Sequence, residues 1–209
     1  MFIKSITGEG GATVCVTIVD ERSGGTERFF ISSKLWKSLS ADVAESTDAD
    51  EHIYDSLKTA SERTSALREA SRAIGYGEKS EREIGRRLKA KKLPDAAVKW
   101  AVEVLKKNGY IDEERSCAKI AESAVSSKHY GRRRVFDYLL SHGYERSSAE
   151  SAVAAIPEED YRAALIYNIE HKFPDIADCD IKEQQKAIAA LMRLGFSGGE
   201  ISDAIRERR

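Results

Sequence analysis

The feature that most constrains the fold is an internal repeat anchored on three leucines. Leu88, Leu139 and Leu191 are 51 and 52 residues apart, and each lies in a segment with helical periodicity. Apolar residues recur four residues before each anchor and five, ten and fourteen residues after it. They are Ile84, Val135, Ala187, Leu93, Tyr144, Phe196, Val98, Ala149, Ile201, Val102, Val153 and Ile205. Short helices cannot bury such faces alone, so the pattern predicts tandem three-helix repeats in an elongated, curved array.

The first copy carries clear helix start and stop signals. Residues 63–74 have the apolar spacing of its first helix. Ser80 and Glu83 have the spacing of a capping box that opens the second helix. Pro94 favours the start of the third, and Gly109 its end. The first copy is therefore expected to consist of three consecutive helices.

The chain before the repeats has a different character. Three short runs rich in β-branched and aromatic residues are separated by glycine-containing turns, which predicts a small β-meander; the runs are Phe2–Ile6, Ala12–Val19 and Glu27–Ile31. Ser32 or Ser33 is placed to cap a short helix. The next stretch is acidic and poor in large apolar residues, typical of a linker or of a poorly packed acidic helix. The expected organisation is a β-rich segment 1–40, an acidic linker 41–60, and repeats 61–110, 111–156 and 157–209.

The formal net charge of −1 hides an uneven distribution of charge. Residues 67–110 hold twelve Lys or Arg against six Asp or Glu, whereas residues 1–60 hold six against ten and residues 157–209 eight against eleven. A basic middle between acidic ends suits an anionic partner that meets only the middle. An internally compensated dipole is the alternative interpretation.

Two groups of residues carry the binding hypothesis. The first lies on the second helix of copy one and contains Arg86, Arg87, Lys89, Lys91 and Lys92. The second opens the corresponding helix of copy two and contains Lys128, Tyr130, Arg132, Arg133 and Arg134. Cations in a first helical turn oppose the helix dipole, so three arginines there call for a reason outside the helix. Equivalent helices of stacked repeats share a face, so the two groups are either one stripe for an anionic partner or ordinary solvated charges.

Motifs for catalysis and metal binding are weak by comparison. Residues 195–199 match G-x-S-x-G, but that elbow needs a preceding strand and this one follows a helical pattern. Ser197 and Glu200 fit a capping box better. The other candidates are scattered, which argues against a disulfide framework, a metal site or a cofactor: Cys15, Cys117, Cys179, His52, His129, His142 and His171. No cationic–apolar leader and no apolar run of about 20 residues is present, so we expect a soluble cytoplasmic protein without a membrane contact.

Order and spacing of several motifs resemble the bacterial RecX regulatory proteins over about residues 60–209. The motifs are Ser80-x-x-Glu83-Ile84-x-x-Arg87-Leu88, Gly109-Tyr110-Ile111-Asp112-Glu113, Lys128-x-Tyr130-Gly131-x-x-Arg134-Val135-x-x-x-Leu139 and Leu191-x-x-x-Gly195-Phe196-Ser197-x-x-x-Ile201. One departure is Ser116, which stands where the family usually has an aromatic residue.

The resemblance implies tandem three-helix repeats and a non-enzymatic role. RecX proteins bind the RecA filament on single-stranded DNA and restrain its ATP hydrolysis, strand exchange and co-protease activity. Under this hypothesis the basic residues face DNA phosphate or an acidic RecA surface, and the protein acts as a monomer. The alternatives are a nucleic-acid-binding protein without RecA contact and, resting on Ser197 alone, a hydrolase.

Overall fold

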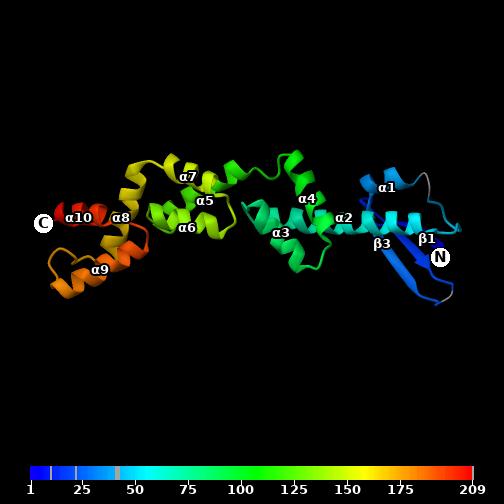
Figure 1. Ribbon diagram of the computed structural model, residues 1–209, viewed down its shortest axis with the longest axis horizontal. Coiled ribbons are helices and arrows are strands. Elements are labelled where there is room, and N and C mark those ends of the chain that lie inside the picture. Colours follow the sequence, from blue (N-terminus) through cyan, green and yellow to red (C-terminus); the bar gives the residue numbers. More distant parts are fainter. Residues whose placement is uncertain (10, 22, 41–42, 209) are drawn as a thin grey trace. The chain divides into compact units, whose positions relative to one another are not determined.

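The computed structural model describes residues 1–9, 11–21, 23–40 and 43–208. Gly10 of the first predicted turn and the linker residues Ala41 and Asp42 lie outside the described residues. The described chain is mainly helical with a small β-rich beginning, which confirms the predicted fold class (Figure 1). Its elements are β1 (Phe2–Glu9), β2 (Thr13–Val19), β3 (Thr26–Ser32), α1 (Ser33–Leu39), α2 (Glu51–Gly75), α3 (Glu81–Ala90), α4 (Asp95–Lys107), α5 (Glu113–Ser126), α6 (Arg132–Ser141), α7 (Arg146–Ala155), α8 (Glu158–Lys172), α9 (Ile181–Arg193) and α10 (Gly198–Arg206).

The chain divides into two compact units. The N-terminal unit contains Met1–Gly77 and Ile84–Tyr110, and the C-terminal unit contains Glu78–Glu83 and Ile111–Arg209. The helices follow the β-strands as three sets of three, α2–α4, α5–α7 and α8–α10. The two units do not coincide with the repeat boundaries expected from the sequence, so those boundaries stay a prediction.

In the N-terminal unit, an antiparallel sheet packs against one long helix. The strands have the order β1-β2-β3, and Figure 1 shows α2 lying against β3. Alternate residues of the strands face α2, as expected for a sheet with one buried face; the fully or nearly fully buried ones are Ile3, Val16, Ile18, Phe29 and Ile31. Leu57 and Ala60 of α2 complete this core.

The free edge of β3 is covered by hydroxyl groups of α2. The backbone N–H of Phe30 donates to Ser61 Oγ at 3.2 Å, and that of Ser32 donates to Thr64 Oγ1 at 2.9 Å. Exposed strand edges invite pairing with other chains, so satisfying these donors protects the sheet against edge-to-edge association.

The second half of the acidic segment 41–60 is helical, so of the two interpretations of this stretch the linker is wrong for residues 51–60 and the acidic helix is right. Residues 51–60 are the first turns of α2, capped by Asp50, whose carboxylate accepts the N–H of Ile53 at 2.8 Å. The segment contains few large apolar residues because its packing against the sheet needs only a narrow stripe. Leu57 and Ala60 supply that stripe together with the partly buried Ile53 and Tyr54, and the acidic side chains lie outside it.

The anchor positions of the repeat are buried in all three copies. Leu88, Leu139 and Leu191 are each 1% exposed or less. The turn four residues after each anchor is also the same, because Lys92, Gly143 and Gly195 all have positive φ, at 59°, 91° and 98°. A left-handed residue is a usual way to end a helix, and glycine adopts it without the steric cost that other residues incur.

Two glycines fix the contact between the second and third copies in the C-terminal unit. The Gly131 N–H at the start of α6 donates to Leu194 O at 2.8 Å, and the Arg133 N–H donates to Gly195 O at 3.3 Å. A Cβ atom on Gly195 would lie 2.3 Å from the backbone nitrogen of Arg134. A Cβ atom on Gly131 would lie 2.5 Å from the carbonyl carbon and oxygen of Gly195. The turn between α9 and α10 therefore sits directly on the backbone that opens α6, where only glycine fits.

The preceding contact repeats this arrangement one copy earlier. Gly143 stands in the turn after α6, and a Cβ there would lie 2.9 Å from Arg82 Cβ and 3.1 Å from Ser80 Oγ. Ser80 donates to the His142 carbonyl and also caps α3 by accepting the Glu83 N–H at 3.1 Å. The turn after α6 thus meets the start of α3 in the same way as the turn after α9 meets the start of α6, although the residues differ.

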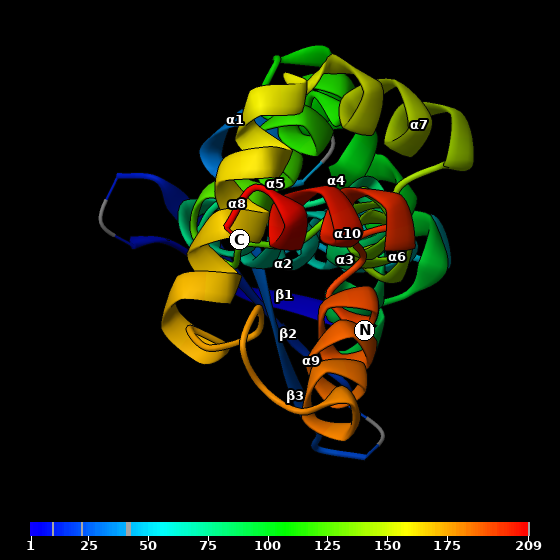
Figure 2. The same ribbon diagram turned by 90° about the vertical axis from the view of Figure 1, so that its left-hand side faces the viewer.

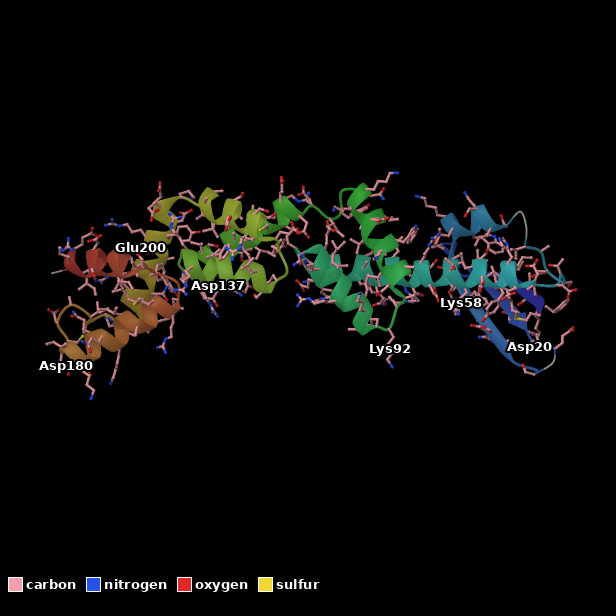
Figure 3. All side chains as sticks on the ribbon, in the orientation of Figure 1. Asp20, Lys58, Lys92, Asp137, Asp180 and Glu200 are labelled. Carbon is pink, nitrogen blue, oxygen red and sulfur yellow. The ribbon has the colours of Figure 1, made fainter. Side chains whose placement is uncertain are left out.

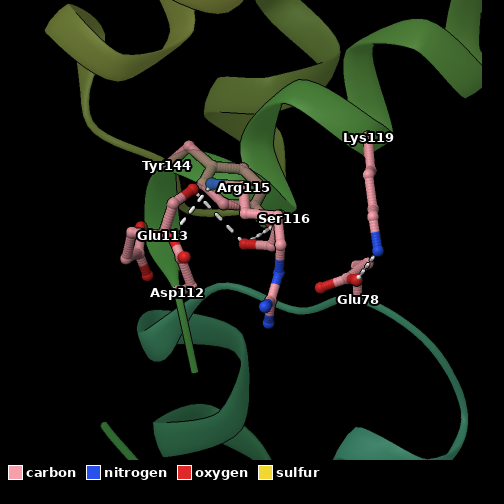
Figure 4. A network of polar contacts seen from close by, with 7 residues as sticks. All are labelled: Glu78, Asp112, Glu113, Arg115, Ser116, Lys119 and Tyr144. Carbon is pink, nitrogen blue, oxygen red and sulfur yellow. Dashed lines mark hydrogen bonds and ion pairs between the residues drawn. The ribbon is translucent and has the colours of Figure 1, made fainter. Parts of the chain in front are cut away.

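Residues 78–83 join the C-terminal unit through polar contacts as well (Figure 4). Lys119 of α5 forms an ion pair with Glu78 at 2.9 Å, and the Glu113 carboxylate accepts the Glu81 N–H. Ser116, the departure from the family pattern, is buried and accepts a hydrogen bond from the Tyr144 hydroxyl at 3.0 Å. A small polar residue here leaves room for the phenol of Tyr144 and satisfies its hydroxyl.

Two buried tyrosines make the stability of the C-terminal unit sensitive to alkaline pH. Burial is the main cause that raises the pKa of both Tyr144 and Tyr161 to about 12. An unfolded tyrosine ionises near pH 10, so the unfolded state releases its proton first as the pH rises. Below about pH 10 these two tyrosines should have no pH-dependent effect on the free energy of unfolding. By about pH 12 their ionisation in the unfolded state should lower it by about 2 to 3 kcal/mol per tyrosine.

Urea unfolding between pH 8 and pH 12 measures this effect. Other groups titrate in the same range, so the informative quantity is the difference between the wild type and Tyr144→Phe at each pH. That difference should shrink above pH 10, because phenylalanine has no proton to lose. A difference that stays constant across the range would contradict a raised pKa at Tyr144.

Candidate functional site

The first predicted group of basic residues lies on the surface of the N-terminal unit. All five members are exposed on α3 and the turn that follows it, and we call them the α3 basic group: Arg86, Arg87, Lys89, Lys91 and Lys92. The Lys89 ammonium forms an ion pair with Asp95 at 3.1 Å. Figure 3 shows Lys92 at the turn between α3 and α4 with its side chain directed away from the helices.

The second predicted group is divided by the structure. Lys128, Tyr130 and Arg134 lie together at the start of α6. The Lys128 ammonium is 5.9 Å from the centroid of the Tyr130 ring, and the Arg134 guanidinium is 5.5 Å from the same centroid. The ring quadrupole attracts cations at such positions. This attraction holds the two side chains near the ring and leaves their positive charges in place.

Two residues that were not predicted complete this cluster. Tyr138 packs edge-on against Tyr130 with centroids 6.0 Å apart, and the Lys128 ammonium donates to the Tyr138 hydroxyl at 2.6 Å. His142 packs against Tyr138 with centroids 4.1 Å apart. We call these five residues the cation–aromatic patch: Lys128, Tyr130, Arg134, Tyr138 and His142. Four of them are spaced every fourth residue, the helical spacing that would have revealed them in the sequence.

The position of the His142 ring follows from its backbone partner. His142 Nδ1 lies 2.8 Å from the Tyr138 carbonyl oxygen, which can only accept a hydrogen bond, so Nδ1 donates in this contact. The patch thus combines two cations, two phenol rings and one imidazole on the first turns and one face of α6.

Arg132 and Arg133 do not belong to this patch. The Arg132 guanidinium forms an ion pair with Glu158 and lies 4.4 Å from the centroid of the Tyr161 ring. It therefore links α6 to α8 inside the C-terminal unit. Arg133 is exposed, and its backbone N–H is part of the contact with Gly195. The sequence could not separate these three arginines, because Glu158 and Tyr161 lie in a different helix.

The α3 basic group and the cation–aromatic patch belong to different units. A single stripe that joins them therefore stays a prediction. Each is a solvent-facing set of cations by itself, and the patch also carries aromatic rings.

The hydrolase alternative loses its structural basis. Ser197 is preceded by helix α9 and caps α10 through a complete capping box with Glu200. The Ser197 Oγ accepts the Glu200 N–H at 3.3 Å, and the Glu200 carboxylate accepts the Ser197 N–H at 2.6 Å. Within the described ranges, no three His, Cys, Asp or Glu side chains gather as metal ligands, and no helix is long and apolar enough to cross a membrane.

Comparisons with known proteins agree on one family. The chain is 33% identical over 138 residues to a curated relative named Regulatory protein RecX from Xanthomonas campestris pv. campestris, covering 65% of this chain and 84% of the relative. A protein of the same name from Oceanobacillus iheyensis is 24% identical over 135 residues, covering 64% of this chain and 50% of that protein. No family model matches the chain.

Two crystal structures share the fold. A structure of regulatory protein RecX superimposes with a TM-score of 0.73 at 17% identity and covers 97% of this chain and 98% of its own. A structure of RecX from Lactobacillus salivarius has a TM-score of 0.61 at 15% identity, covering 70% of this chain and 96% of its own. The alignment with the second structure therefore leaves part of the present chain unmatched.

Proposed function

Because this chain belongs to the RecX family of regulatory proteins, we propose that it binds the RecA filament on single-stranded DNA and restrains its activities. The activities concerned are those expected from the sequence resemblance: ATP hydrolysis, strand exchange and co-protease function. The protein would act in the cytoplasm as a monomer and without a reaction of its own.

The cation–aromatic patch is the observation that carries this proposal. Proteins that hold single-stranded nucleic acid combine cations that follow the phosphates with aromatic rings on which bases stack. Lys128 and Arg134 supply the cations, and Tyr130 and Tyr138 supply the rings. Arginine and lysine also release counterions from the nucleic acid when they bind it, which favours association at low salt.

The decisive measurement is ATP hydrolysis by RecA on single-stranded DNA. Increasing amounts of the purified protein should lower the hydrolysis rate at ratios below one molecule per RecA subunit. An unchanged rate at saturating protein would contradict the proposal. Salt-sensitive binding to bare single-stranded DNA, without sedimentation alongside RecA filaments, would instead identify a direct nucleic-acid binder.

Charge reversal tests the patch itself. Lys128→Glu combined with Arg134→Glu should weaken binding to the RecA–DNA filament about ten-fold. The slope of the logarithm of the binding constant against the logarithm of the salt concentration should also become less steep by roughly two, because two cations are lost. Lys182→Glu combined with Lys186→Glu is the matched control, since it makes the same charge change at exposed positions of α9. Equal loss in the two double variants would show a general charge effect rather than a role of the patch.

A further inference from the structure

A shallow apolar groove lies in the C-terminal unit between α5, α7 and α8. Its volume is about 510 Å³, within the range of natural ligand-binding clefts. Five small side chains line it together with Val125 and Ile156, namely Ala118, Ala152, Ala155, Ala163 and Ala164. Because alanine side chains end at Cβ, they leave the floor open for a bulky apolar side chain from another molecule.

The rim of this groove is acidic. Glu122 of α5 and Asp160 of α8 line it, and both are exposed. Among the described residues that line the groove, none is a lysine or an arginine. Burial, together with Lys172 and His171, lowers the pKa of His129, which also lines the groove. A neutral imidazole at pH 7 adds no positive charge to this lining.

The groove adjoins the cation–aromatic patch at a single turn. His129 has a left-handed backbone, with φ of 53°, and its carbonyl accepts a hydrogen bond from the Asn168 amide at 2.7 Å. The His129 ring stacks on Tyr167, which lines the groove, with centroids 3.6 Å apart. The side chains on either side, Lys128 and Tyr130, instead reach the patch.

We propose that this groove binds a segment of the partner protein that presents an apolar side chain beside a lysine or arginine. The inference rests on the proposed function and assigns the protein component of the filament, rather than its DNA, to the groove. Charge complementarity argues for this occupant, because Glu122 and Asp160 attract a cation and repel phosphate. The apolar floor suits an amphipathic helix or extended segment that inserts one large side chain.

Charge reversal at the rim tests the inference with a matched control. The test variant is Glu122→Lys with Asp160→Lys, and the control is Glu114→Lys with Glu159→Lys. Both variants change one exposed glutamate on α5 and one exposed acidic residue in the first turn of α8, so their net charges are identical. The helix-dipole cost in α8 is the same in both, whereas in α5 only Glu114→Lys places a cation in the first turn, so the unfolding of both variants in urea is compared as well.

Two affinities are measured for each variant: for RecA filaments formed on single-stranded DNA with a non-hydrolysable ATP analogue, and for bare single-stranded DNA. We expect the test variant to bind the filament about ten-fold more weakly than the control variant, because like charges would then meet across the groove. Binding to bare DNA should be equal in the two variants. Ala163→Trp, which fills the groove from an exposed helical position, should also weaken filament binding without weakening DNA binding.

The possible results separate the two hypotheses. Equal filament affinity in the test and control variants, with no loss in Ala163→Trp, would overturn the assignment of the groove while leaving the proposed function intact. A selective change in binding to bare DNA would place nucleic acid in the groove and also overturn it. If the wild-type protein fails to bind filaments at all, the proposed function fails and the groove assignment falls with it.

Discussion

Replacing Gly195 by alanine should lower the free energy of unfolding of the C-terminal unit by about 2 to 5 kcal/mol. Two costs combine at this position. The backbone has a φ of 98°, which is unfavourable for residues with a Cβ atom. The new methyl group would lie 2.3 Å from the backbone nitrogen of Arg134, so the α9–α10 turn and the start of α6 would have to separate. That separation would also break the hydrogen bonds by which Gly131 and Arg133 hold the turn.

Both tryptophans help to locate this effect. Trp36 and Trp100 belong to the N-terminal unit, so tryptophan fluorescence during urea unfolding reports that unit, whereas far-UV circular dichroism reports the helices of both. The Gly195→Ala variant should shift the circular dichroism transition and leave the fluorescence transition in place.

Gly198→Ala is the control for this variant. A Cβ on Gly198 meets no heavy atom within 4 Å, and the residue opens α10. Alanine there should leave stability unchanged or raise it by up to about 1 kcal/mol. Equal losses for the two variants would contradict the close approach at Gly195.

Replacing Leu139 by alanine should cost about 3 to 5 kcal/mol, because it removes a fully buried side chain from the core of the C-terminal unit. Leu139 is the repeat anchor of the second copy, and its surroundings come from several helices whose backbones cannot all move to fill the space. The cost is measured as the change in the circular dichroism transition in urea.

The neighbouring leucine provides the comparison. Leu140 lies on the same helix but is only half-buried beside the core. Leu140→Ala should cost clearly less than Leu139→Ala, because water can reach part of the space that it leaves. If the two changes cost the same, the repeat anchor would have no special place in the packing.

The regular part of the fold could be predicted because it is encoded locally. The anchors Leu88, Leu139 and Leu191 mark helix faces by spacing alone, and all three are buried. Ser197 could be assigned to a helix cap because its partner, Glu200, is three residues away. Such features need no knowledge of distant parts of the chain.

The sequence is less informative where a distant partner determines the structure. Residues 51–60 are compatible with a linker or with a helix in the sequence, and the sheet that provides the surface for Leu57 decides for the helix. Arg132 cannot be distinguished from Arg134 in the sequence, because the ion pair that ties Arg132 to Glu158 joins two helices. Tyr138 and His142 are different, because their four-residue spacing from Tyr130 and Arg134 is visible in the sequence.

The first and third copies differ from the second at the positions through which copies meet. Gly143 and Gly195 lie against the preceding copy, whereas Lys92, at the corresponding position of the first copy, has a side chain. At the other end, α9 begins ten residues before its anchor, whereas α3 and α6 begin seven before theirs. The additional turn lies at the start of α9, the part of the helix that in α3 and α6 receives the turn of the following copy. The contact between copies thus depends on a small residue in the turn and on where the next helix begins, two features that neighbouring repeats have to match.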